Sequence, residues 1–232
     1  NATVASAALA LLISFIFFLF FNSMQNKLEA EKRATEAQLR LLQAQIEPHF
    51  LFNTLANVQS LMDHDLPSAK QMLASFTDYL RASLTTLRSD SSPVAHELAL
   101  AQSYLQLLQA RMEDRLQFSI HADDTARALP LPPLLLQPLV ENAVVHGLEP
   151  SIAGGTVQVS ARVQGQQLVL EVQDDGMGLN APARPGRRTG HGMALANIRQ
   201  RLLTRYGSAA TLEVTALHPG TLARITLPLE AP

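Results

Sequence analysis

The N-terminal end of the chain constrains its fold more than any other feature. Residues 2–21 carry no charged side chain, and the first charge is Lys27. An α-helix rises about 1.5 Å per residue, so this stretch is just long enough to cross a hydrocarbon core of ~30 Å. A cleaved signal peptide would need a positive region before the apolar run and a small-residue cleavage site after it, and neither is present. We therefore predict a transmembrane helix in residues 1–22, with membrane lipid contacted through residues 2–21.

Basic residues lie on one side of this predicted span. Lys27, Lys32 and Arg33 follow it closely, and no basic residue precedes it. Loops rich in lysine and arginine stay on the cytoplasmic side of a membrane. We therefore expect residues 23–232 in the cytoplasm and the chain at the cell (inner) membrane.

The composition excludes several classes of function. With 18 Lys+Arg against 20 Asp+Glu, a formal charge of −2 and no dense basic run, the chain is not expected to bind nucleic acid directly. It has no cysteine, so disulfides, thiolate metal sites and cysteine nucleophiles are all excluded. The seven histidines are scattered, which also argues against a metalloprotein.

The first part after the span is predicted to be helical. Residues 23–62 contain no glycine and one proline, which indicates a long helix leaving the membrane. Leu28, Leu39, Leu42 and Ile46 follow a seven-residue pattern. This pattern is compatible with a short coiled coil or dimer helix and equally with a solvated stalk. Apolar residues at helical spacing predict two more helices, over residues 67–87 and 94–112.

The periodicity changes after Arg115. Alternating apolar residues predict strands over 116–120, 156–163, 168–173, 211–217 and 222–227. Helices are expected over 134–146 and 193–206. We place the domain boundary near residue 115, with a helical domain over 23–115 and an α+β sandwich over 116–232.

Three short motifs in the second half could carry chemistry. Asn142 and His146 lie one helical turn apart, so they share a face. An amide oxygen suits Mg²⁺, and an imidazole can hydrogen-bond a phosphate, although such a pair is more often ordinary polar surface. The segment DDGMG at 174–178 follows a strand, where a carboxylate could accept a hydrogen bond from an adenine amino group; a plain Asp-Gly turn is the alternative. Gly190 and Gly192 precede a helix and could cradle phosphate with backbone N–H groups.

A fourth motif lies in the helical half. Pro48 interrupts an otherwise helical pattern beside His49, where a proline costs about 3 kcal/mol. A neutral imidazole nitrogen is a competent nucleophile toward phosphorus, and Asn53, one turn later, could orient a water or a phosphoryl group. The alternative is a helix break that separates stalk from core, with His49 incidental.

Taken together, these motifs resemble those of LytS/YehU-type sensor histidine kinases. The segment EPHFLFNTL at 47–55 resembles the phosphoacceptor box of that family, and LLQPLVENAVVHG at 135–147 resembles its N box. DDGMG at 174–178 and GHGMALANIRQRL at 190–202 are similar to its two glycine boxes. Asp175 stands where asparagine is common in the family, and Met193 where leucine is common.

The resemblance implies a fold, a site and ligands. It implies a membrane-anchored α plus α+β protein: a transmembrane helix, a helical dimerisation and phosphoacceptor domain, and a C-terminal Bergerat α/β sandwich that binds ATP and Mg²⁺. His49 would be phosphorylated, with Asn53 assisting. Asn142 would bind Mg²⁺, with Glu141 and His146 supporting the phosphates. Asp174 would contact adenine. The remaining pocket residues implied are Gly176, Gly178, Gly190, Gly192 and Met193.

The resemblance also implies an activity and partners. The chain would be a homodimeric two-component sensor kinase that autophosphorylates His49 and passes the phosphoryl group to an aspartate of a cytoplasmic response regulator, of the LytTR type in many family members. Two rivals remain: a nucleotide-binding scaffold that transfers nothing, and an ATPase whose cycle drives a clamp.

Overall fold

The computed structural model describes residues 24, 48–86, 91–179 and 190–229. The chain divides into two compact units, residues 1–53 and 54–232. The predicted transmembrane helix and the stalk over 25–47 lie outside the described residues and stay predictions. Within the described ranges, no helix is both long enough and apolar enough to cross a membrane.

The predicted helices of the first half are confirmed where the structure describes them. Helix α2 runs from Pro48 to His64, and α3 from Leu66 to Thr86, with Asp65 between them. The Asp65 carboxyl caps the start of α3, because it accepts hydrogen bonds from the Ser68 backbone N–H at 3.1 Å and from the Ser68 hydroxyl at 2.6 Å. These hydrogen bonds hold the pKa of Asp65 below its ordinary value.

Helix α4, Val94–Met112, is the central helix of the larger unit. The predicted apolar face is buried, and so are Leu100, Tyr104 and Leu107 on other sides of the helix. The reason is that α4 packs against α3 on one side and against strand β2 (Leu116–Ala122) and helix α6 (Gln137–Asn142) on another. A helix that is apolar on most sides is typical of one enclosed by neighbours.

The predicted strands form one five-stranded sheet with the order β2-β4-β5-β7-β6. Strand β2 pairs with β4 in parallel, and the other pairs are antiparallel. The strands are β2 (Leu116–Ala122), β4 (Gly155–Gln164), β5 (Gln167–Asp174), β6 (Thr211–Ala216) and β7 (Thr221–Pro228). The small elements β1 (Ser92–Pro93), β3 (Pro130–Leu131) and α5 (Asp124–Arg127) are not predicted by the sequence pattern.

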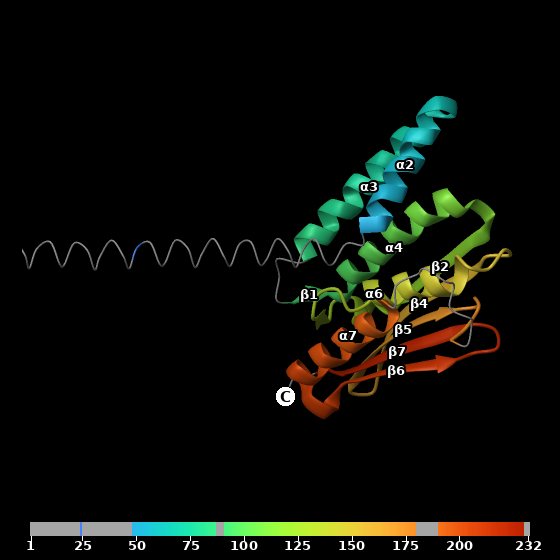
Figure 1. Cartoon of the computed structure of the whole chain (residues 1–232). Helices are drawn as coiled ribbons and strands as arrows, with labels where there is room; N and C mark the ends of the chain where they lie inside the picture. Colours follow the sequence, from blue (N-terminus) through green and yellow to red (C-terminus); the bar gives the residue numbers. More distant parts are fainter. Residues whose placement is uncertain (1–23, 25–47, 87–90, 180–189, 230–232) are drawn as a thin grey trace, which may run out of the picture. The chain divides into compact units, whose positions relative to one another are not determined.

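Strand register gives the sheet one apolar face and one charged face. Val159 lies opposite Val172, and Leu170 lies opposite Ile225, and all four side chains are buried. Helices α4, α6 (Gln137–Asn142) and α7 (Gly190–Tyr206) lie along one side of the sheet (Figure 1). On the opposite face, Glu171 pairs with both Arg162 and Arg224. The sheet and the helices that cover its apolar face therefore form a two-layer α/β sandwich, as the sequence predicts for residues 116–232.

The helix expected over 134–146 differs from the prediction at both ends. Residues 134–136 are not helical, and Leu134 has φ 57°, in the left-handed region. The helix begins at Gln137, with Pro138 in its first turn, and continues after Asn142 as a π-helical turn, Ala143–Leu148. The predicted start at Leu134 is therefore wrong. The backbone N–H groups of 134–136 bind a side chain from α4 instead of opening a helix.

Candidate functional site

Two of the predicted motifs meet at one place in the sandwich. The backbone N–H of Met177 donates to the Gly147 carbonyl at 2.9 Å. A Cβ on Gly176 would overlap the Gly147 backbone, and a Cβ on Gly147 would lie 2.6 Å from Asp174 Oδ1. Both glycines are therefore required by close approach rather than by flexibility. The end of the helical segment that carries Asn142 and His146 thus packs directly on the turn that follows β5.

Asp174 is the buried acidic group at this junction. It is the last residue of β5 and is 4% exposed. Burial raises its pKa to about 6, and the Asp175 charge adds to that rise, while N–H and hydroxyl donors of Gly176 and Thr221 oppose it. The Gly176 N–H donates to Oδ1 at 3.0 Å. A carboxyl group held in this way changes its charge close to neutral pH, which is a property often found at functional sites.

Gly178, in the turn after β5, and Gly220, just before β7, meet at the same corner. Gly220 has φ 99°, and a Cβ there would overlap the Asp174 carbonyl. Gly178 has φ 74°, and a Cβ on it would lie 3.2 Å from the Gly220 carbonyl oxygen. Only glycine fits at position 220, because the backbone there has a positive φ and also lies against the Asp174 carbonyl.

Asp175 has a structural task. Its Oδ1 accepts the Thr156 N–H at 2.6 Å, and its own N–H donates to the Thr156 carbonyl at 3.3 Å. These bonds fix the first residues of β4 against the turn after β5. An asparagine oxygen could accept the same N–H, so the departure from the family pattern at this position leaves the geometry intact.

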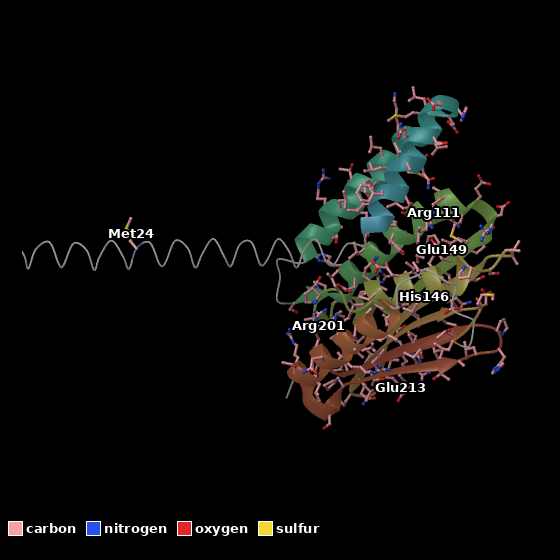
Figure 2. All side chains as sticks on the ribbon, viewed as in Figure 1. Met24, Arg111, His146, Glu149, Arg201 and Glu213 are labelled. Carbon is pink, nitrogen blue, oxygen red and sulfur yellow. The ribbon has the colours of Figure 1, made fainter. Side chains whose placement is uncertain are left out.

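Glu141, Asn142 and His146 lie on the helical layer above the sheet, where Figure 2 labels His146. All three are half-buried, whereas Val144 and Gly147 beside them are buried. Glu141 accepts a hydrogen bond from Gln137 Nε2 at 3.0 Å, and the same nitrogen lies 3.4 Å from the Tyr79 hydroxyl.

The π-helical turn begins directly after Asn142. Sequence periodicity does not reveal this turn, which widens the helix between Asn142 and His146. Such turns recur at functional sites because they change the direction in which side chains project.

The second glycine motif lies inside α7 rather than in a loop before it. Gly190 and Gly192 belong to the first turn of this helix, so the expected start at residue 193 is wrong by three residues. The backbone N–H groups of a first turn have no intrahelical acceptor, so a helix start is suited to binding an anion. Met193 follows in the same helix, and the preceding loop, 180–189, lies outside the described residues.

His49 and Asn53 belong to the smaller unit. Both lie in the first turns of α2, one helical turn apart, as the sequence predicts. The structure describes Pro48 as the first residue of this helix. Whether the helix continues before it falls outside the described residues.

The donor set is compatible with a magnesium–nucleotide complex. Among the described residues there is no group of three or more histidine and acidic side chains that could hold a metal ion. Mg²⁺ in nucleotide sites keeps several waters and takes one or two protein oxygens plus phosphate oxygens, so a single amide such as Asn142 fits this chemistry.

Fold and site define the class as a two-layer ATPase-type sandwich joined to a helical domain. Residues 132–231 match the family described as histidine kinase-, DNA gyrase B- and HSP90-like ATPase, and residues 37–116 match the family described as histidine kinase.

Curated relatives agree with these matches. Sensor protein LytS of Oceanobacillus iheyensis is 35% identical over 213 residues, which cover 87% of this chain and 36% of the relative. Sensor histidine kinase BtsS of Escherichia coli is 36% identical over 195 residues, covering 84% and 34%. The protein YwpD of Bacillus subtilis is 34% identical over 188 residues, covering 79% and 67%. The chain belongs to the histidine kinase family, with a LytS-like kinase region, and it spans about a third of the length of the LytS and BtsS proteins.

Proposed function

We propose that this chain is the kinase region of a membrane-anchored, two-component sensor histidine kinase. The observation that carries the proposal is the direct packing of the Asn142–Gly147 segment on the Asp174–Gly178 turn, which brings two motifs of the nucleotide site together. Residues 1–22 would anchor the chain, 23–115 would form the dimeric helical domain, and 116–232 would bind ATP.

Each residue of the ATP site has a distinct task in this proposal. The buried Asp174 carboxylate accepts a hydrogen bond from the adenine amino group, with few waters to compete. Gly176 and Gly178 let the backbone pass close to the base. Asn142 holds Mg²⁺ and His146 donates to phosphate, while Glu141, oriented by Gln137, supports the phosphate side.

The phosphate end of the nucleotide would lie near the start of α7. The N–H groups around Gly190 and Gly192 carry the partial positive charge of a helix N-terminus, which favours phosphate. Mg²⁺, when bound, neutralises charge on the phosphate oxygens. Catalysis is mostly positioning and charge neutralisation, as in other phosphoryl transfers.

The acceptor would be His49. A neutral imidazole nitrogen forms a bond to the γ-phosphorus as the bond from that phosphorus to the bridging oxygen of ADP breaks. The phosphoryl group then passes to an aspartate of a cytoplasmic response regulator, which we expect to be of the LytTR type, and Asn53 assists its later removal. LytS and BtsS are both named as sensor proteins, which supports a sensory role here.

Labelling with γ-labelled ATP and Mg²⁺ tests the acceptor and the donor site together. The full chain, in lipid nanodiscs, is compared with His49→Gln and Asn142→Ala. His64→Gln, an exposed histidine at the other end of α2, and Gln158→Ala, an exposed side-chain amide on β4, are the matched controls. We expect acid-labile, alkali-stable label in wild type and both controls, and none in the two test variants.

Other outcomes separate the rival functions. Label that survives His49→Gln would show that the acceptor is another residue. ATP binding without any label would favour a nucleotide-binding scaffold. Steady ATP hydrolysis that is unchanged by His49→Gln would favour an ATPase that drives a clamp.

A further inference from the structure

A buried carboxyl group on α4 holds the backbone that leads into the candidate site. Glu97 is fully buried, with 0% of its surface exposed. Its Oε1 accepts the Leu134 N–H at 2.6 Å, and its Oε2 accepts those of Leu135 and Leu136 at 3.0 and 3.1 Å. Burial raises the pKa of Glu97, and the three N–H donors together with Arg201 oppose that rise.

These three N–H groups need an acceptor from elsewhere in the chain. They precede the first turn of α6, so no helix carbonyl is available to them. Residues 134–136 are leucines, whose side chains cannot accept hydrogen bonds, and all three are buried. A buried N–H without an acceptor costs about 1–3 kcal/mol. Glu97 supplies the acceptors from 37 to 39 residues earlier in the chain.

Arg201 on α7 holds the same turn through its carbonyl groups. Its Nη2 donates to the Pro133 carbonyl at 2.5 Å, and its Nη1 to the Leu134 carbonyl at 3.4 Å. The turn at 133–136 is therefore fixed by a carboxyl group from α4 and a guanidinium from α7. Figure 2 labels Arg201 on α7.

We propose that Glu97 and Arg201 form a positioning clamp on residues 133–136. The clamp sets the position of α6, which carries Asn142, relative to α7, whose first turn carries Gly190 and Gly192. The role of the clamp in ATP binding rests on the proposed function, because Asn142, Gly190 and Gly192 are the candidate contacts for Mg²⁺ and phosphate. The clamp acts through the backbone, so neither Glu97 nor Arg201 touches the nucleotide.

The clamp also joins the two regions that match separate family models. Glu97 lies within residues 37–116, matched by the histidine kinase model, whereas residues 133–136 and Arg201 lie within 132–231, matched by the ATPase model. A change in α4 therefore reaches the ATP-binding region at the start of α6 without passing through the sheet.

Two readouts on the full chain test the clamp. Glu97→Gln keeps the volume of the side chain but replaces one acceptor oxygen by a donor NH₂ group that faces an N–H. Arg201→Met removes both donors to the turn from a side chain that is only partly buried, so it provides a second variant if the first folds poorly. Glu113→Gln, exposed just after α4, and Arg127→Met, exposed at the end of α5, are the matched controls.

Hydrogen exchange is the first readout and needs no nucleotide. We expect Glu97→Gln to speed exchange of the amides over 134–142 and also over the first half of α7, with the sheet unchanged. Arg201→Met should do the same to a smaller extent, and the controls should not. Faster exchange confined to 134–136, or spread evenly over the whole sandwich, overturns the clamp.

Nucleotide binding is the second readout. A clamp that aligns Asn142 with the start of α7 predicts that Mg²⁺-dependent ATP affinity falls about tenfold in Glu97→Gln. Binding of adenosine, which has no phosphate, should change less than twofold. An equal loss for ATP and adenosine indicates simple destabilisation and overturns the positioning role. If wild type binds no ATP, the proposed function fails, and the exchange data alone then decide whether the clamp exists.

Discussion

Asp174→Asn should make the protein more stable at neutral pH. The wild-type carboxyl is 4% exposed, and burial raises its pKa from 3.8 to about 6. The folded state therefore holds the Asp174 proton more tightly than the unfolded state, so folding stability from this group falls as pH rises between these two pKa values. At about 1.4 kcal/mol for each unit of pKa, the full cost of ionising Asp174 in the folded protein is about 3 kcal/mol. An asparagine has the same shape and never carries this charge.

Urea unfolding at several pH values measures this effect. The stability gain of Asp174→Asn over wild type should be roughly 1.5 kcal/mol at pH 5 and about 3 kcal/mol at pH 7.5, where it levels off. Asp114→Asn, at an exposed aspartate, is the control. A gain that does not change with pH, or a loss that grows with pH, would refute the argument that burial dominates at Asp174.

The same substitution should weaken ATP binding. An ionised carboxylate accepts a hydrogen bond from an adenine amino group more strongly than a neutral amide does, because charge-assisted hydrogen bonds are about twice as strong. We expect ATP affinity at pH 7.5 to fall about tenfold in Asp174→Asn, although the protein is more stable. Calorimetric titration with ATP measures the loss, and unchanged affinity would remove Asp174 from the adenine contact.

Two further substitutions test the packing and the charged face. Gly176→Ala should destabilise the sandwich by about 1–3 kcal/mol, because its Cβ would overlap the Gly147 backbone. Gly165→Ala has open space around the Cβ but a φ of 61°, so we expect it to lower the free energy of unfolding by about 1 kcal/mol. Urea unfolding measures both variants, and equal losses of stability would contradict this reasoning. On the exposed face, hydrogen bonds and charge from two arginines lower the pKa of Glu171. Its stabilising effect should therefore be present at neutral pH and lost as pH falls through that lowered pKa, so thermal melts of Glu171→Gln and wild type should converge in acid.

The sequence predicts most of the elements because local pattern determines them. Alternation of apolar residues locates all five long strands, and helical spacing locates α3 and α4 to within one residue. The pairing of β2 with β4 is not predicted, because two alternating segments do not specify which strand lies beside which. The start of α6 is misplaced because the leucines at 134–136 suit a helix, and an acceptor from α4 overrides that preference.

The sequence likewise predicts some residues of the candidate site and misses others. The sequence motifs locate Asn142, Asp174 and Gly176, since glycine and acidic residues after a strand indicate a special turn. Glu97 is missed because one glutamate near the start of a helix is usually a solvent-exposed residue that favours the helix dipole. Its complete burial and its three distant donors depend on tertiary contacts, which no local pattern reports. Arg201 is missed for the same reason.

Asn142 and His146 of the candidate site lie in a segment that contacts helix α4 at both ends of the segment. Glu97 binds the backbone just before α6, and Arg111 pairs with Glu149 just after the π-helical turn, a pair that Figure 2 labels. Fourteen residues separate Glu97 from Arg111, about 21 Å along a helix, and a similar number separates residue 135 from Glu149. The two segments therefore run parallel and in step, so a shift of α4 along its axis would carry Asn142 and His146 with it. Helix α4 is buried on most sides because α3 packs against one side of it, and β2 and α6 pack against another.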